Sequence, residues 1–276
     1  MKKNLKPIDM KKTKTAVGPF EQVLPMTGLP LKGRLSDAQL PIIEQGGILF
    51  LGEKILGVGR FEDIKQEATT VIPIKGKQVF LPGMIDSHTH ICFSGSRAND
   101  FALRNSGKTY LDIAAQGGGI WDTVTKTRQA TSKTLVAGIV ARSKTHLEQG
   151  TTTLEVKSGY GLSVKEELKM LKAIQKANET VVQDLIATCL AAHIKPKDIV
   201  GSASQYLAEI SEKLFPILIK EKLTNRIDAF VEESAFSETE IEPYLRKAKS
   251  MGFDLTVHAD QFTTMGRRIA TMLGAV

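Results

Sequence analysis

The chain has 276 residues, of which 42% are hydrophobic and 24% are charged, a composition typical of a globular protein with one sizeable core and a small accessory domain. Its net charge of +7 comes partly from a lysine-rich arm at the amino terminus. The arm contains Lys2, Lys3, Lys6, Lys11, Lys12 and Lys14. No nucleic-acid-binding motif follows this arm, so we expect no nucleic-acid partner. We also expect no membrane span and no signal peptide, because no apolar run approaches about 18 residues and none follows the first lysines.

The amino-terminal part, residues 1–78, is predicted to be a tail followed by a small β unit, a portion of a β-sandwich. Residues 1–35 have no clear pattern and are expected to be irregular, and residues 32–37 are expected to form a loop. Residues 46–60 predict two short strands around a Gly-Glu-Lys turn, and residues 71–74 predict another strand. A meander this short is marginally stable, so it needs a packing partner.

From residue 79 onward, the pattern changes to strands that alternate with helices. The predicted strands are residues 79–85, 150–156, 184–192, 226–232 and 253–257. The predicted helices are residues 133–149, 164–179, 202–221 and 238–251, the third with a break at Pro216. Ser163 with Glu166, and Ser237 with Glu240, form capping-box patterns at two helix starts. This alternation predicts a parallel sheet with covering helices.

Polar residues gather where these strands end, which favours a (β/α)8 barrel over an open doubly wound sheet. The residues are His88, His90, Lys157, Tyr160, His193, Glu233, His258, Asp260 and Gln261. Residues 79–276 accommodate about five strand-helix units, whereas a closed barrel has eight. We therefore expect an incomplete barrel with two open edges and an exposed apolar face.

His88 and His90 are two residues apart near the end of the first predicted barrel strand. Side chains alternate across a strand, so both imidazoles, together with Asp86, are expected to point to one face. Neutral imidazole nitrogen binds Zn, Fe and other borderline divalent ions well. The alternative is a pair of surface histidines beside a turn.

Five segments carry a resemblance to a known family: LPGMIDSHTHICFSGSR at 81–97, QGGGI at 116–120, EVKSGYGL at 155–162, AAH at 191–193 and HADQ at 258–261. Together they resemble the imidazolonepropionases, histidine-degrading members of the amidohydrolase superfamily. The resemblance covers roughly residues 46–276. It implies hydrolysis of 4-imidazolone-5-propanoate to N-formimidoyl-L-glutamate with one divalent ion, Zn or Fe, which would lower the pKa of a bound water and polarise the ring carbonyl.

The resemblance also implies roles for individual residues. His88, His90 and His258 match metal ligands, and Arg97, Tyr160, His193 and Gln261 match substrate contacts. A guanidinium such as that of Arg97 suits a propionate carboxylate, which it can bind through two parallel hydrogen bonds. The catalytic aspartate and a further histidine of the family are expected beyond Val276, so we expect weak metal binding and negligible turnover. Some members have Glu where this chain has Gln261, and an amide cannot act as a general base.

The sequence is also compatible with other roles for these residues. His193 could be a core histidine, Tyr160 a turn aromatic and Arg97 an ordinary loop residue. The function could be that of another cyclic-amide amidohydrolase or deaminase, a non-catalytic remnant, a binding subunit completed by another chain, or a basic nucleic-acid-binding protein. Cys92 and Cys189 form no C-x-x-C motif, so a cytoplasmic location is expected. The expected partner is a small-molecule substrate, and a homodimer is compatible with the sequence.

Overall fold

The computed structural model describes residues 13–109, 112–113, 117–261 and 263–275. Of the lysine-rich arm, only Lys14 lies within these residues. The chain divides into two compact units, Met1–Gly83 and Met84–Val276. None of the described helices is long and apolar enough to cross a membrane.

The first unit is a five-stranded sheet with the strand order β3-β2-β1-β4, in which β5 also pairs with β1. Its strands are β1 (Thr15–Val23), β2 (Ile43–Leu51), β3 (Lys54–Arg60), β4 (Thr70–Pro73) and β5 (Val79–Phe80), and the short helix α1 (Phe61–Ile64) follows β3. The predicted hairpin over residues 46–60 and the predicted strand near residue 71 are confirmed.

The prediction that residues 1–35 are irregular is wrong, because β1 is the central strand of this sheet. Its pairing with β2 shifts register between Val17 and Phe20, around Pro19. Such a bulge breaks the alternation of apolar and polar residues by which a strand is recognised in a sequence. The prediction of one strand over residues 79–85 is also wrong, since Val79–Phe80 pairs with β1 and a second strand begins only at Met84.

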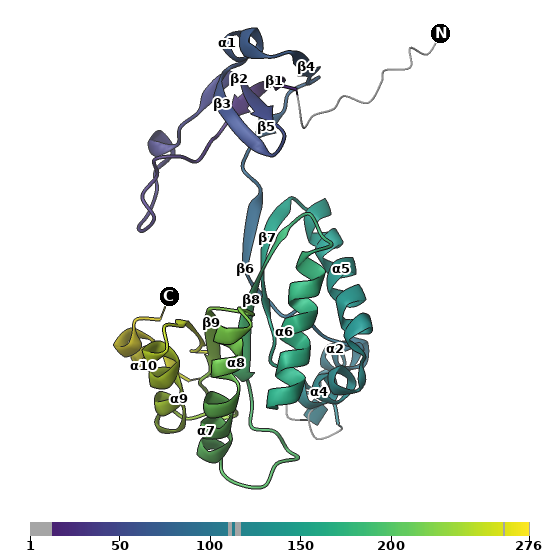
Figure 1. Cartoon of the computed structure of the whole chain (residues 1–276), viewed down its shortest axis with the longest axis vertical. Helices are drawn as coiled ribbons and strands as arrows, with labels where there is room; N and C mark the ends of the chain where they lie inside the picture. Colours follow the sequence, from purple (N-terminus) through teal and green to yellow (C-terminus); the bar gives the residue numbers. More distant parts are fainter. Residues whose placement is uncertain (1–12, 110–111, 114–116, 262, 276) are drawn as a thin grey trace. The chain divides into compact units, whose positions relative to one another are not determined.

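The second unit is a parallel sheet in the order β10-β9-β8-β7-β6 (Figure 1). Its strands are β6 (Met84–Thr89), β7 (Thr151–Lys157), β8 (Asp184–Ala192), β9 (Arg226–Phe230) and β10 (Asp254–His258). Its helices are α2 (Ala98–Asn105), α4 (Ile120–Gln129), α5 (Ser132–Glu148), α6 (Val164–Asn178), α7 (Ala203–Lys213), α8 (Phe215–Lys220), α9 (Glu238–Ser250) and α10 (Gly266–Leu273). The predicted incomplete β/α barrel is confirmed, whereas α2, α4 and α10 were not predicted.

Local sequence explains where several of these helices begin. The Ser163 hydroxyl accepts a hydrogen bond from the Glu166 amide, and Ser237 forms a capping box with Glu240. Pro216 lies in the first turn of α8, where a missing N–H costs little, so the predicted helix over residues 202–221 divides at Leu214.

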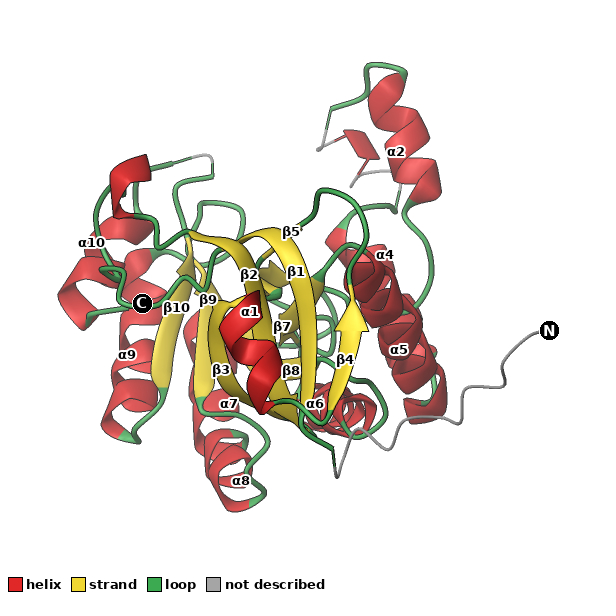
Figure 2. Ribbon diagram, turned by 90° about the horizontal axis from the view of Figure 1, so that it is seen from above, coloured by secondary structure: helices red, strands yellow, loops and turns green. Residues whose placement is uncertain are grey.

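One face of the sheet packs against the helices. Alternate residues such as Leu154, Val156 and Ile227 belong to the same buried cluster as Met170 and Leu245 on α6 and α9. Figure 2 shows these helices around the outside of the strands. Burial of this face supplies the main stabilisation of the unit, since burying a large aliphatic side chain contributes about 1.5–3 kcal/mol.

The prediction that the sheet has two open edges is confirmed by its outermost strands. Within the described residues, β6 pairs only with β7 and β10 only with β9, so both are edge strands. Met84 and Ile85 on β6 are therefore 57% and 71% exposed. The concave face of the sheet borders a cavity of about 610 Å³ lined largely by polar residues, among them Lys157, Arg226, Asp228 and Asp254. Polar side chains therefore lie on a face that was expected to be apolar.

Candidate metal centre

Three histidines converge at the carboxyl end of the second unit's sheet. The Nε2 atom of His90 lies 3.3 Å from Nε2 of His88 and 3.2 Å from Nε2 of His258. His88 lies on β6 and His90 follows it, while His258 ends β10. Four strand spacings would separate these strands by roughly 19 Å in a flat sheet. The sheet therefore curls enough to bring its two edges together at this point.

The prediction that Asp86 points to the same face as His88 and His90 is wrong. The pairing of β6 with β7 shifts register between Asp86 and Thr89, so the two histidines and Asp86 no longer share a face. The Asp86 carboxylate accepts a hydrogen bond from the His88 amide and lies 3.8 Å from Nδ1 of His146 on α5. Among the described residues, only His88, His90 and His258 form a group that could hold a metal ion.

The histidine geometry fits a divalent transition-metal ion. Two imidazole nitrogens bound at about 2.05 Å with a tetrahedral angle between them would be about 3.3 Å apart. The observed separations of 3.2 and 3.3 Å match that value. Burial, together with the neighbouring His193, His258 and His88, lowers the pKa of His90 from 6.5 to about 3. His90 is therefore neutral at physiological pH, which is the form that binds a metal.

A buried ionic network that the sequence did not predict holds the third histidine. The Asp228 carboxylate on β9 lies 2.9 Å from Nδ1 of His258 and 2.7 Å from the ammonium group of Lys157. Lys157 also lies 2.6 Å from Glu155, which in turn accepts a hydrogen bond from the Thr89 amide. Burial raises the pKa of Asp228, but the contacts with His258 and Lys157 outweigh it and hold that pKa well below its usual value.

This network orients His258. A carboxylate 2.9 Å from Nδ1 of His258 favours the tautomer with the proton on Nδ1, which leaves Nε2 to face the other two histidines. The sequence shows which residues of β7 and β9 alternate between the two faces of the sheet. It does not show which charged residue on one strand pairs with which residue on another.

A cavity of about 260 Å³ adjoins the three histidines, and it includes three of the four predicted substrate contacts. Tyr160 lies on the loop after β7, His193 directly follows β8, and Gln261 follows β10. The remaining lining residues are Ile120, Phe230 and Ser234. The backbone N–H of Gln261 donates a 2.7 Å hydrogen bond to the Glu232 carboxylate, which also accepts one from the Thr263 hydroxyl. The loop after β10 is therefore tied to the end of β9.

The ring of His193 has a defined orientation. Its Nδ1 lies 2.9 Å from the carbonyl oxygen of Gly159, so Nδ1 carries the proton and Nε2 is the nitrogen that can accept a hydrogen bond. Burial lowers the pKa of His193 from 6.5 to about 4. His193 is thus a neutral ring at the cavity wall rather than a charge.

Arg97, the fourth predicted substrate contact, does not line this cavity. It precedes α2 and forms an ion pair with Asp100. Asp100 also accepts a hydrogen bond from the Gly119 amide at the start of α4. Of the QGGGI segment, Gln116 lies outside the described residues, and a Cβ on Gly118 would lie 2.5 Å from Asp100. The glycine run thus allows a close contact between α2 and α4.

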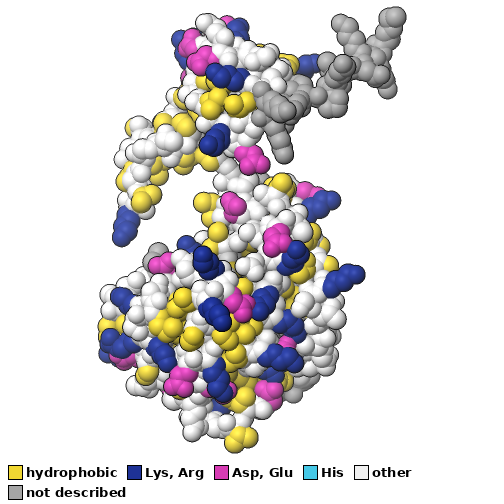
Figure 3. Space-filling view, viewed as in Figure 1, with side chains coloured by type: hydrophobic (Ala, Val, Ile, Leu, Met, Phe, Trp, Pro, Cys, Tyr) yellow, Lys and Arg dark blue, Asp and Glu magenta, His cyan; other side chains and the backbone are white. Residues whose placement is uncertain are grey.

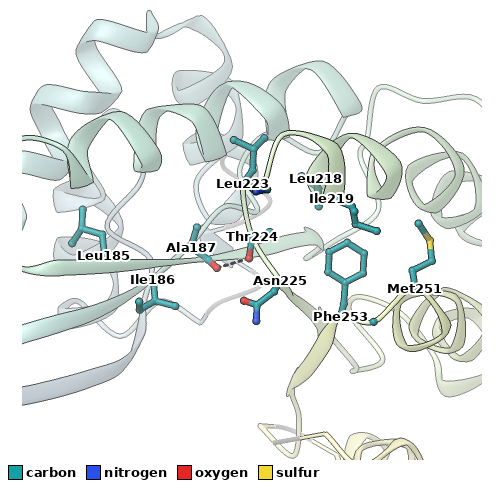
Figure 4. Close-up of a pocket in the computed structure, with 12 residues that line it drawn as sticks. Leu185, Ile186, Ala187, Leu218, Ile219, Leu223, Thr224, Asn225, Met251 and Phe253 are labelled. Atoms are coloured by element: carbon teal, nitrogen blue, oxygen red, sulfur yellow. Dashed lines mark hydrogen bonds between the residues drawn. The ribbon is translucent and has the colours of Figure 1, made fainter.

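A larger cavity of about 510 Å³ lies elsewhere in the unit (Figure 4). It borders the amino-terminal ends of β8, β9 and β10, opposite the histidines, and most of its lining is apolar, including Leu185, Leu218, Met251 and Phe253. Thr224 Oγ1 donates to the Ala187 carbonyl oxygen at its wall. Its only ionisable lining residue is Lys222, so no histidine, cysteine or carboxylate lines it to bind a metal ion.

The surface gives no support to the nucleic-acid hypothesis on the face in view. In Figure 3, lysine and arginine side chains of the second unit are interspersed with aspartate and glutamate. A nucleic-acid interface requires a continuous cationic patch or stripe.

Comparison with known sequences identifies relatives over most of the chain. The model of the amidohydrolase family matches residues 79–266. The imidazolonepropionase of Bdellovibrio bacteriovorus is 37% identical over 249 residues, which are 88% of this chain and 58% of that protein. The imidazolonepropionase of Erwinia tasmaniensis is 38% identical over 232 residues, 84% of this chain and 57% of that protein. The chain therefore spans somewhat more than half the length of these relatives, and the resemblance of its motifs is confirmed.

Solved structures show the same fold. A triazine hydrolase from Arthrobacter aurescens superposes with a TM-score of 0.63 at 14% sequence identity, over 95% of this chain and 58% of that one. A guanine deaminase from C. acetobutylicum gives a TM-score of 0.52 at 13% identity, over 94% of this chain and 56% of that one. At this identity the likeness concerns the fold alone.

Proposed function

The chain belongs to the amidohydrolase family, and from this premise we propose that it carries the metal site and part of the substrate pocket of an imidazolonepropionase. The proposed reaction is hydrolysis of 4-imidazolone-5-propanoate to N-formimidoyl-L-glutamate. The observation that carries the proposal is the convergence of His88, His90 and His258 beside a cavity lined by Tyr160, His193 and Gln261. The 36–38% identity to named imidazolonepropionases supports the choice of substrate.

Each residue has a chemical task in this proposal. The three histidines would hold one divalent ion, Zn or Fe, which when bound supplies a Lewis acid and lowers the pKa of water. Tyr160 and neutral His193 would hydrogen-bond the polar atoms of the five-membered ring. Gln261 can orient a substrate through its amide, but it cannot take a proton from water. These side chains bind and orient the ring rather than transfer its protons.

Arg97 would bind the propionate carboxylate only after a rearrangement. Its guanidinium is paired with Asp100 and lies outside the cavity lining, so it would have to exchange one carboxylate for another. Such an exchange replaces one ion pair with another, since a guanidinium can bind a propionate carboxylate through two parallel hydrogen bonds. Arg97 is therefore the proposed contact for the propionate carboxylate.

Metal titration tests the site. Calorimetry of the purified 276-residue chain with Zn²⁺, and with Fe²⁺ under anaerobic conditions, should show one ion per chain, and His90→Asn should abolish binding. His146→Asn is the matched control, because His146 lies on α5 beside Asp86 and outside the group of three. Equal binding by His90→Asn and the unaltered chain would refute the assignment. The preferred ion is the one with the lower Kd.

The substrate proposal needs a separate test, because no described carboxylate joins the three histidines. We expect the chain to bind imidazole-4-propanoate, a stable molecule with the same ring size and side chain, with chemical-shift changes at Tyr160 and His193. Turnover of the imidazolone should be negligible. Measurable hydrolysis would show that a metal-bound carboxylate is not required.

A group of three histidines without a described carboxylate is also compatible with a second candidate, a binding subunit that uses the pocket without catalysis. The two candidates separate in a mixture with a separately expressed carboxyl-terminal half of a relative. Restored hydrolysis supports the enzyme, and ligand binding without hydrolysis in the mixture supports the binding subunit.

A further inference from the structure

We infer that Glu167 is a positioning residue whose buried carboxylate fixes the loop after β7, and through it Tyr160 and His193. This deepens the proposed function, since those two side chains are its proposed substrate contacts. Glu167 lies near the start of α6, on the far side of the loop from the histidines, and none of its side chain is exposed.

The Glu167 carboxylate accepts hydrogen bonds from the loop that follows β7. Its Oε1 accepts hydrogen bonds of 2.8 Å from the amides of Gly161 and Leu162, and its Oε2 accepts one of 3.1 Å from the amide of Gly159. The Ser158 hydroxyl also donates to it. The Glu167 side chain therefore binds three backbone amides within four residues, on both sides of Tyr160.

The carbonyl side of the same loop is bound by the opposite charge. Arg128 on α4 donates to the carbonyl oxygens of Gly161 and Leu162 at 2.6 and 3.1 Å. The loop peptides thus lie between a carboxylate on their N–H side and a guanidinium on their C=O side. Because each ion aligns with the peptide dipoles, the arrangement holds the loop more firmly than either contact alone.

The backbone needs such a restraint. Leu162 has φ +51°, a left-handed conformation that is strained for a residue with a side chain. A Cβ on Gly161 would lie 2.5 Å from backbone atoms of Glu166 and Glu167, so the loop passes directly over the helix start. A conformation of this kind persists only where surrounding contacts determine it.

The restraint reaches the cavity by two routes. Tyr160 lies between the amides that Glu167 binds, so its Cα has little freedom. The carbonyl of Gly159 receives the Nδ1 proton of His193, which fixes the ring's tautomer and leaves Nε2 as the acceptor. Loss of the carboxylate should therefore release both side chains without any change at the three metal-binding histidines.

Glu167→Gln is the direct test. It preserves size but replaces one acceptor oxygen with an NH2 group that faces N–H donors. Glu166→Gln is the matched control, because the side chain of Glu166 pairs with Lys165 and Lys169 instead of the loop. We expect amide exchange at Gly159 and Gly161 to accelerate by about tenfold or more in Glu167→Gln, while the amides of β7 keep their protection.

The ring nitrogens of His193 give a readout that a merely structural role would not change. In the unaltered chain and in Glu166→Gln, long-range ¹H–¹⁵N spectra should show a single neutral tautomer with the proton on Nδ1. In Glu167→Gln the two nitrogen signals should move toward each other as the tautomers mix. Unchanged signals together with unchanged exchange in Glu167→Gln would overturn the inference.

If Glu167→Gln does not fold, hydrogen exchange of the backbone amides in the unaltered chain tests the inference instead. Amides 159, 161 and 162 should exchange as slowly as those of β7, and exchange as fast as in residues 195–201 would overturn the inference. None of these readouts requires substrate. Failure of imidazole-4-propanoate to bind while the His193 tautomer responds to Glu167→Gln would count against the proposed function and leave the loop restraint intact.

Discussion

Replacing Asp228 with asparagine should destabilise the second unit and weaken metal binding together. Asp228 is 1% exposed and is the anion shared by Lys157 and His258. Removing one partner of a buried ion pair costs about 3–5 kcal/mol, because the other charge stays buried. Lys157 keeps Glu155 at 2.6 Å, so we expect the lower end, about 3 kcal/mol. Loss of a carboxylate behind a ligating histidine lowers metal affinity about 10–100-fold.

Urea unfolding followed by Trp121 fluorescence measures the first quantity, and calorimetric titration with Zn²⁺ measures the second. Asp254→Asn is the matched control, since Asp254 is an exposed carboxylate on the neighbouring strand and accepts a hydrogen bond from the Asn225 side chain. It should change the unfolding free energy by less than about 0.5 kcal/mol. If Asp228→Asn changes the unfolding free energy by less than 1 kcal/mol and leaves the Zn²⁺ affinity intact, the network does not act as described.

Three further outcomes are expected. Burial lowers the pKa of His193 from 6.5 to about 4, so the unfolded chain binds more protons at this residue between these pH values. His193 should therefore lower the free energy of unfolding by up to about 3 kcal/mol as the pH drops from 6.5 to 4, and His193→Gln should reduce the pH dependence in urea titrations by this amount. Gly161→Ala should lower the melting temperature by several degrees, because its Cβ would meet the start of α6 at 2.5 Å. Zn²⁺ at about 100 times its Kd should stabilise the unaltered chain by about 2.7 kcal/mol and leave His258→Asn unchanged in the same thermal assay.

Much of the second unit was predictable from the sequence, because the apolar residues of its strands and of its helices follow regular patterns. The strand over residues 184–192 was predicted to the residue, and capping residues located the starts of α6 and α9. Since the carboxyl ends of parallel strands meet at one edge, the histidines could also be assigned to one end of the sheet. What they contact there could not be predicted from spacing.

The errors have specific physical origins. A bulge concealed β1 and another turned Asp86 away from the histidines, and a bulge leaves no reliable pattern in a single sequence. Glu167 was missed because a glutamate in the first turn of a helix is ordinary on composition alone. Its burial depends on a loop that returns over the helix, which only the three-dimensional structure shows.

The curvature of the sheet and the assembly of the site arise from the same interactions. An inward-facing layer in a barrel is ordinarily filled by bulky branched side chains. Here the layer nearest the histidines contains Glu155, Lys157 and Asp228, which join β7 to β9 and then to His258 on β10. Attraction across the concave side favours a curled sheet over a flat one, and the curl brings His258 within 3.2 Å of His90. Replacing the network with apolar residues would therefore preserve packing while removing the force that brings the two edge strands to a common metal.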